Sequence, residues 1–126
     1  MSILNELDNY IKENISPNEI YSHIHSIHGK QEDFEEGDIN DRIYGYDTYV
    51  YDENIPMEDV DLQEWDLDED YVEDIIEEIK KNNDYEPIVV GETDVSYYTI
   101  IDGLHRLNAL NELGYKTFKG YIGKNK

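Results

Sequence analysis

The clearest pattern of apolar and polar positions lies between residues 97 and 114. Tyr97 to Ile101 is a run of β-branched and aromatic residues, which is typical of a buried or half-buried strand. The Asp-Gly pair at 102–103 signals a turn. Leucine and alanine then recur at helical spacing up to Gly114, a residue type that favours the end of a helix. The pattern predicts a strand, a tight turn and a helix, with His105 and Arg106 in the first helical turn.

Two helices are predicted near the N-terminus. Isoleucine, leucine and tyrosine recur at helical spacing from Ile3 to Asn14. A Ser-Pro-Asn-Glu capping box at 16–19 then begins a second helix, which ends near His28. The acidic stretch 30–41 is rich in turn residues and is interpreted as a linker.

The rest of the chain alternates between strand and helix signals. We predict strands at 42–51, 87–90 and 116–122, a turn at 52–54, and a strand end or single helical turn at 55–60. Residues 65–70 lead into a predicted helix that ends at Lys80 and Lys81. Asp66 or Asp68 is the expected N-cap of that helix. This order predicts a small mixed-sheet α/β domain over residues 44–126, preceded by a helical hairpin and acidic linker over residues 1–43.

The net charge of −21 is concentrated in the middle of the chain. Residues 31–86 hold 23 of the 31 acidic residues and three of the ten basic residues. Such a field repels phosphate backbones, so we do not expect direct binding to nucleic acid. Residues 87–126, which carry the strand–turn–helix pattern, hold four acidic and five basic residues and are therefore close to neutral.

The chain contains no cysteine and no long apolar run. The lack of cysteine excludes disulfides, thiolate catalysis and cysteine-based zinc sites. No segment suits a transmembrane helix, and the N-terminus does not have the pattern of a signal peptide. We therefore expect a cytoplasmic protein with no membrane partner.

Three histidines lie on the second predicted helix. His25 and His28 share a face of that helix, whereas His23 lies on another. No acidic residue at helical spacing completes an obvious set of metal ligands. We favour a solvated or partly buried helix face over a metal site.

Several stretches resemble the ParB/sulfiredoxin-like superfamily. They are Glu86 to Val90, Tyr98 to Arg106 with its Asp-Gly-Leu-His-Arg core, and the helical positions Ala109, Leu110 and Gly114. The resemblance covers roughly residues 44–122 and implies the small mixed α/β fold of that superfamily. Its members include ParB partition proteins, which are CTP-binding clamps on DNA, as well as sulfiredoxins, free-serine kinases and proteins labelled ParB-like nucleases.

The resemblance implies a nucleotide held at the turn and the helix start. The implied ligand is ATP or CTP with Mg²⁺, and the implied activity is that of a small phosphotransferase or NTPase. The implied phosphate-binding residues are Gly103, Leu104, His105 and Arg106. Asp102 is the implied metal or hydroxyl partner. The candidate catalytic residues are Asp102, His105 and an acid on the early strands, for which Glu53, Glu58 and Asp59 are the candidates.

The sequence differs from members of the superfamily in two ways, and each difference argues against one of their functions. Leu104 stands where sulfiredoxins have their catalytic cysteine, which excludes sulfinic-acid reduction. ParB proteins carry a downstream helix-turn-helix, whereas this sequence ends at Lys126, close to where the fold closes, so we do not expect DNA partitioning.

Two of the implied site residues also have possible structural roles. Arg106 suits an ion pair with an internal acid, and Asp102 suits a helix N-cap.

A second class of function follows from the charge. A compact acidic surface can mimic DNA and bind a basic DNA- or RNA-binding protein, as expected of an anti-restriction or anti-defence inhibitor, an immunity protein or an antitoxin. A phage or mobile-element setting would fit such a non-enzymatic interaction protein. The predicted surface consists of Asp59, Asp61, Glu64, Asp66, Asp68, Glu69, Asp70, Glu73 and Asp74.

Overall fold

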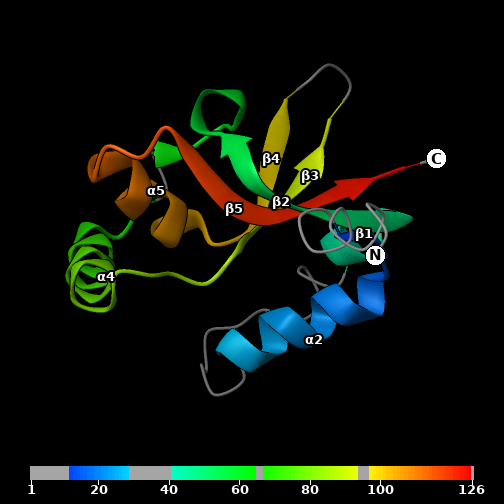
Figure 1. Cartoon of the computed structure of the whole chain (residues 1–126), viewed down its shortest axis with the longest axis horizontal. Helices are drawn as coiled ribbons and strands as arrows, with labels where there is room; N and C mark the ends of the chain where they lie inside the picture. Colours follow the sequence, from blue (N-terminus) through cyan, green and yellow to red (C-terminus); the bar gives the residue numbers. More distant parts are fainter. Residues whose placement is uncertain (1–11, 29–40, 65–66, 94–96, 126) are drawn as a thin grey trace, which may run out of the picture.

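The computed structural model describes residues 12–28, 41–64, 67–93 and 97–125. Its centre is a five-stranded sheet with the strand order β1-β2-β5-β3-β4 (Figure 1). The strands are β1 (Lys12–Ile15), β2 (Thr48–Pro56), β3 (Ile88–Glu92), β4 (Tyr98–Asp102) and β5 (Thr117–Lys124). Strands β3 and β5 are parallel, and the other neighbouring pairs are antiparallel. The predicted mixed α/β fold is therefore confirmed.

Helices cover both faces of the sheet. Helices α4 (Glu69–Asn82) and α5 (Leu104–Glu112) pack on one face, and α2 (Pro17–His28) packs on the other (Figure 1). The alternation along β3 shows the two layers. Ile88 and Val90 belong to the core under α4 and α5, whereas Val89 belongs to the core under α2. Both faces are buried, which explains why three apolar residues follow one another at the start of β3.

Side-chain caps begin two of these helices. The hydroxyl of Ser16 accepts a hydrogen bond from the Glu19 N–H at 3.3 Å, and the Glu19 carboxylate accepts one from the Ser16 N–H at 3.1 Å. This is the predicted capping box of α2. The Asp68 carboxylate accepts hydrogen bonds from the N–H groups of Asp70 and Tyr71 at 3.1 and 3.3 Å. The predicted cap of α4 is therefore confirmed at Asp68.

Residues 12–14 form a strand, so the helix predicted for them is wrong. Lys12 pairs with Tyr51 and Ile15 pairs with Tyr49 across the β1–β2 ladder. The side chain of Ile15 is 3% exposed and belongs to the core under α2. Pairing with β2 and burial of Ile15 outweigh the helical spacing of the local sequence. The rest of the predicted first helix, residues 3–11, lies outside the described residues.

Strand β2 begins later and runs further than the sequence predicts. Residues 41–43 form a helical turn, and the strand starts only at Thr48. Residues 52–54 continue the strand through a register shift against β5 that lies between Asp52 and Ile55. The Asp52 carboxylate accepts a hydrogen bond from the Asn54 N–H at 2.8 Å, the kind of local contact that makes aspartate common in turns. The strand predicted at 42–47 and the turn predicted at 52–54 are therefore wrong.

The predicted strand end and helical turn at 55–60 is confirmed. Strand β2 ends at Pro56, and the 3-10 helix η1 (Met57–Asp59) follows it directly. The Asp61 N–H then donates to the Tyr98 carbonyl at 3.2 Å, which covers part of the outer edge of β4. None of the described helices is long and apolar enough to span a membrane.

Candidate functional site

The candidate site lies where β4 passes into α5. Gly103 joins the two elements with φ +103° and ψ 27°, and it is the N-cap residue of α5. A Cβ atom at this position would lie 2.9 Å from Ile88 Cδ1 and 3.0 Å from Arg106 Nη2. Glycine is therefore required both for the left-handed backbone and for the close packing of the arginine. Asp102 is not the N-cap, so that structural alternative is wrong.

The first turn of α5 offers backbone donors. No side chain caps this helix start, and its first helical hydrogen bond runs from the Leu107 N–H to the Gly103 carbonyl at 2.7 Å. The N–H groups of Leu104, His105 and Arg106 precede that bond, so they have no partner within the helix. Such a turn carries partial positive charge and attracts anions.

Arg106 is committed to structural contacts within the protein. Its Nε donates to the Glu86 carbonyl at 2.8 Å, and its Nη2 donates to the Pro87 carbonyl at 2.9 Å. Nη2 also lies 3.7 Å from the Asp102 carboxylate, and the two side chains are only 12% and 8% exposed. Burial lowers the pKa of Arg106, although the charge of Asp102 opposes this shift. The arginine therefore ties the start of α5 to the chain that leads into β3, as the structural alternative for Arg106 expects.

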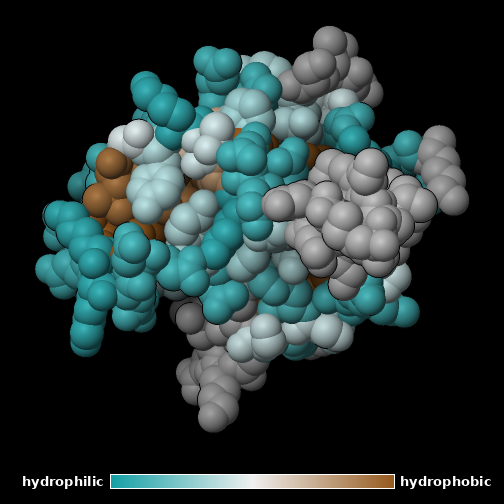
Figure 2. All heavy atoms as spheres, in the orientation of Figure 1, coloured by the Kyte–Doolittle hydropathy of each residue, from teal (hydrophilic) through white to brown (hydrophobic). Residues whose placement is uncertain are grey.

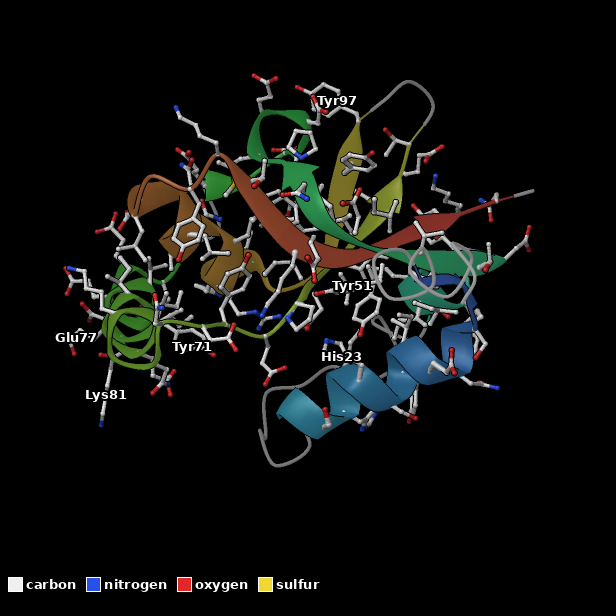
Figure 3. All side chains as sticks on the ribbon, in the orientation of Figure 1. His23, Tyr51, Tyr71, Glu77, Lys81 and Tyr97 are labelled. Atoms are coloured by element: carbon white, nitrogen blue, oxygen red, sulfur yellow. The ribbon has the colours of Figure 1, made fainter. Side chains whose placement is uncertain are left out.

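His105 connects α5 to α4. Its Nε2 accepts a hydrogen bond from the Asp68 N–H at 3.0 Å, so that nitrogen carries no proton in this contact. Its ring lies 4.9 Å from the ring of Tyr71, measured between centroids. Figure 3 shows Tyr71 on α4 beside this region, whereas Glu77 and Lys81 point away from the body of the protein. The histidine therefore fixes the N-terminal turn of α4 against the site.

These residues line an open cleft of about 340 Å³. The cleft is lined by Arg42, Gln63, Tyr71, Ile75, Ile100, Ile101, Asp102, Gly103, Leu104, His105 and Arg106. The structure thus brings together five residues that the sequence singles out: Asp102, Gly103, Leu104, His105 and Arg106. It does not bring Glu53 to them, because Glu53 is exposed on β2 and does not line the cleft.

The described side chains around the cleft do not form a metal site by themselves. Among the described side chains, no three histidine, aspartate or glutamate residues lie close enough together to hold a metal ion. Asp102 contributes one carboxylate, and that carboxylate is paired with Arg106. The assignment of Asp102 as a metal ligand stays a prediction, and any Mg²⁺ at this site would depend mainly on ligand phosphates and water.

The sequence pattern does not identify two residues that line the cleft, Arg42 and Tyr71. It places Arg42 at the start of a predicted strand and Tyr71 within a predicted helix. Both lie more than 30 positions before the motif in the sequence. Their spacing from the motif carries no signal, because only the packing of α4 and of the turn at 41–43 brings them to the cleft.

Two histidines of α2, His23 and His25, have structural partners. His23 Nε2 lies 3.4 Å from the Pro87 carbonyl, and the ring of His23 packs edge-on against Tyr121 with 5.1 Å between centroids. Burial lowers the pKa of His23. His25 packs against Tyr21 with 4.1 Å between ring centroids. Figure 3 shows His23 on the side of α2 that faces the sheet. These contacts agree with the favoured interpretation of a partly buried helix face.

The predicted acidic surface lies mainly on and before α4. Its described members are exposed except Asp59, which is half-buried, and Asp66 lies outside the described residues. Hydrophilic side chains gather over α4 in Figure 2. The buried positions of the helix, Val72, Ile75 and Ile79, face the core. Helix α4 therefore presents a strongly acidic outer face.

Comparison with known proteins identifies the family. Residues 48–125 match the family model of the ParB N-terminal domain. The match covers more than half of the chain, and the chain therefore belongs to the ParB N-terminal domain family. No curated protein matches the sequence.

Two solved structures are similar to this chain. SbnI with a C-terminal truncation, from Staphylococcus aureus, is 26% identical with a TM-score of 0.50, and the match covers 58% of this chain and 30% of the SbnI chain. Sulfiredoxin from Arabidopsis thaliana is 27% identical with a TM-score of 0.49, and the match covers 57% of this chain and 83% of the sulfiredoxin chain. The matched region thus spans less than a third of the SbnI chain.

Proposed function

We propose that this chain binds a nucleoside triphosphate, ATP or CTP, by its phosphate groups at the start of α5. The observation that carries this proposal is the open cleft of about 340 Å³ at an uncapped helix start. Membership in the ParB N-terminal domain family supports it.

The backbone is the main phosphate-binding element in this proposal. The N–H groups of Leu104, His105 and Arg106 and the positive end of the helix attract the phosphates. Gly103 presents no side chain, so the phosphates can approach the turn closely. The hydrogen bond from Asp68 to His105 and the contacts of Arg106 hold this turn in place. Preorganised donors of this kind lower the cost of ordering the site on binding.

We propose that the chain binds a nucleotide, and we do not assign it a particular reaction. Phosphoryl transfer needs groups that position the nucleophile and the leaving phosphate. None of the predicted candidates for a catalytic acid, Glu53, Glu58 and Asp59, lines the cleft. Mg²⁺ enters the proposal only as the ion that accompanies the nucleotide, because the described residues form no metal site of their own.

The test uses two variants at one position. Leu104→Glu places a carboxylate in the first turn of α5, where it suits the helix but competes with a phosphate. Leu104→Gln has nearly the same shape without the charge and is the matched control. Calorimetric titration with ATP and CTP, with and without Mg²⁺, should show binding by the wild type and by Leu104→Gln. Binding by Leu104→Glu should be at least about tenfold weaker. If neither nucleotide produces heat with the wild type, the proposal is wrong.

A second candidate function is binding to a basic protein through α4. The observation that favours it is the run of exposed acidic residues on this helix, at 69, 70, 73, 74, 77 and 78. The variant that tests this function replaces Glu73, Asp74, Glu77 and Glu78 by the corresponding amides, which removes four negative charges with little change in shape. A basic nucleic-acid-binding partner should be retained by the wild type at low salt and released by the variant and by high salt. Equal retention by the two proteins would contradict this function.

A further inference from the structure

We infer that Arg42 supplies the cationic side chain that binds the phosphate chain in this cleft; the inference rests on the proposed nucleotide binding. Arg42 lies outside residues 48–125, the region that matches the family. Among the basic residues that the structure describes, Arg42 and Arg106 are the two that line the cleft. Arg106 already donates to two backbone carbonyls and pairs with Asp102.

The backbone that carries Arg42 is held firmly. The next residue, Ile43, is fully buried in the core under α2. The Tyr49 hydroxyl donates to the Ile43 carbonyl at 2.8 Å, and the Tyr44 hydroxyl donates to the Asn18 side chain at 2.6 Å. Contacts on both β2 and α2 therefore fix the turn at 41–43 and set the origin of the arginine side chain.

The side chain of Arg42, in contrast, is exposed at the edge of the sheet. Its Nη1 donates to the Ile100 carbonyl on β4 at 3.5 Å, two residues before Asp102. A second hollow of about 390 Å³, lined by Tyr46, Thr99 and Asn125 among others, lies on its other side. The Arg42 side chain therefore lines the cleft from the edge of the sheet, beside the strand that carries Asp102. Arginine suits phosphate binding because its planar fork of donors matches phosphate oxygens.

The overall charge favours a cationic side chain at this site. A nucleoside triphosphate is strongly anionic, and this chain carries a net charge of −21. Asp102 adds a carboxylate to the wall of the cleft. Without Arg42, the backbone donors alone would have to overcome this repulsion. An arginine at the mouth of the cleft both attracts the phosphates and hydrogen-bonds to them.

The experiment compares Arg42→Ala, Arg42→Lys and Lys116→Ala with the wild type. Lys116→Ala is the matched control because it changes the net charge by the same amount and lies in a different hollow, beside Met57 and Tyr115. Each protein is titrated with ATP, CTP and tripolyphosphate, and its melting temperature is recorded. We expect Arg42→Ala to weaken binding of all three probes by about 10- to 100-fold, with Lys116→Ala within about twofold of the wild type and Arg42→Lys between them.

The outcomes separate this inference from the proposed function. If the wild type binds none of the probes, both are wrong. If the wild type binds and Arg42→Ala binds equally well, only the role of Arg42 is wrong. Equal losses for Arg42→Ala and Lys116→Ala would show a general effect of charge and would overturn the inference. A loss confined to ATP and CTP would also overturn it, because Arg42 would then contact the base or sugar.

Discussion

Replacing Arg106 by alanine should destabilise the fold, whatever the ligand. The substitution removes two charge-assisted hydrogen bonds, at 2.8 and 2.9 Å, to the carbonyls of Glu86 and Pro87. It also removes the cation that lies 3.7 Å from the carboxylate of Asp102, a side chain that is 8% exposed. Breaking a buried pair by removing one partner costs about 3–5 kcal/mol, and two hydrogen bonds from a charged donor give about the same total. We therefore expect the free energy of unfolding to fall by about 3–5 kcal/mol.

Urea unfolding followed by far-ultraviolet circular dichroism measures this loss. For a domain of this size, the expected change lowers the urea midpoint by about 2 M. Lys119→Ala is the control, because Lys119 forms a much more exposed pair with Asp84 at 2.6 Å. An exposed pair contributes little even at short distance, so the control should lose only a small part of what Arg106→Ala loses. Arg106→Lys keeps the charge but lacks the planar fork of donors, and it should fall between the two.

An equal urea midpoint for Arg106→Ala and Lys119→Ala would refute this reasoning. It would show that the contacts of Arg106 contribute no more than a surface ion pair does. The expected result also has a practical consequence. If Arg106→Ala lost nucleotide binding, partial unfolding would explain the loss as well as a missing phosphate contact would. Arg42→Ala and Leu104→Glu leave these internal contacts in place and are therefore the better tests of binding.

Three further predictions concern the backbone, the titration of one histidine and the N-terminal residues. Gly103→Ala should cost about 2–3 kcal/mol because it combines φ +103° with close contacts, whereas the control Gly114→Ala, with φ +90° and open surroundings, should cost about 1 kcal/mol. Equal melting temperatures of the two variants would contradict this. Because burial lowers the pKa of His23 from 6.5, the unfolded chain binds more protons, and stability should fall as the pH drops below about 6.5. His23→Asn should lose less stability between pH 7.5 and 5.5, and parallel losses in the two proteins would contradict the prediction. Deletion of residues 1–43 should expose the apolar side chains of Val89 and Ile101 and give a protein with enhanced dye binding and no cooperative melt, whereas a sharp melt would contradict this.

The elements predicted correctly are those whose local signals agree with their surroundings. The strand, turn and helix at 97–114 are confirmed because the apolar spacing, the glycine turn and the helix end coincide in one stretch. Helix α4 is confirmed for the same reason, with Asp68 as its cap. The errors at 12–14 and 52–54 have one cause. Both segments are strands because of partners on distant strands, β2 and β5, and local spacing carries no information about those partners.

The residues of the candidate site also fall into two groups, those that the sequence predicts and those that only the tertiary fold brings to the cleft. Residues 102–106 are contiguous, so the motif brings them to one place without any knowledge of the tertiary fold. The partners of Arg106 are different, because two of them are backbone carbonyls about 20 positions earlier in the chain. Arg42 and Tyr71 reach the cleft only through the packing of the turn at 41–43 and of α4. A sequence pattern thus locates the turn but not the side chains that complete its walls.

One backbone carbonyl connects the two layers of the protein at this site. The Pro87 oxygen accepts a hydrogen bond from Arg106 at 2.9 Å and lies 3.4 Å from His23 on the opposite layer. If a phosphate drew Arg106 outward, Pro87 would keep His23 as a neighbouring donor, but the buried carboxylate of Asp102 would lose its ion pair with Arg106. That loss is the costly step. A phosphate therefore gains more from Arg42, which is exposed at the edge of the sheet, than from the arginine within the motif.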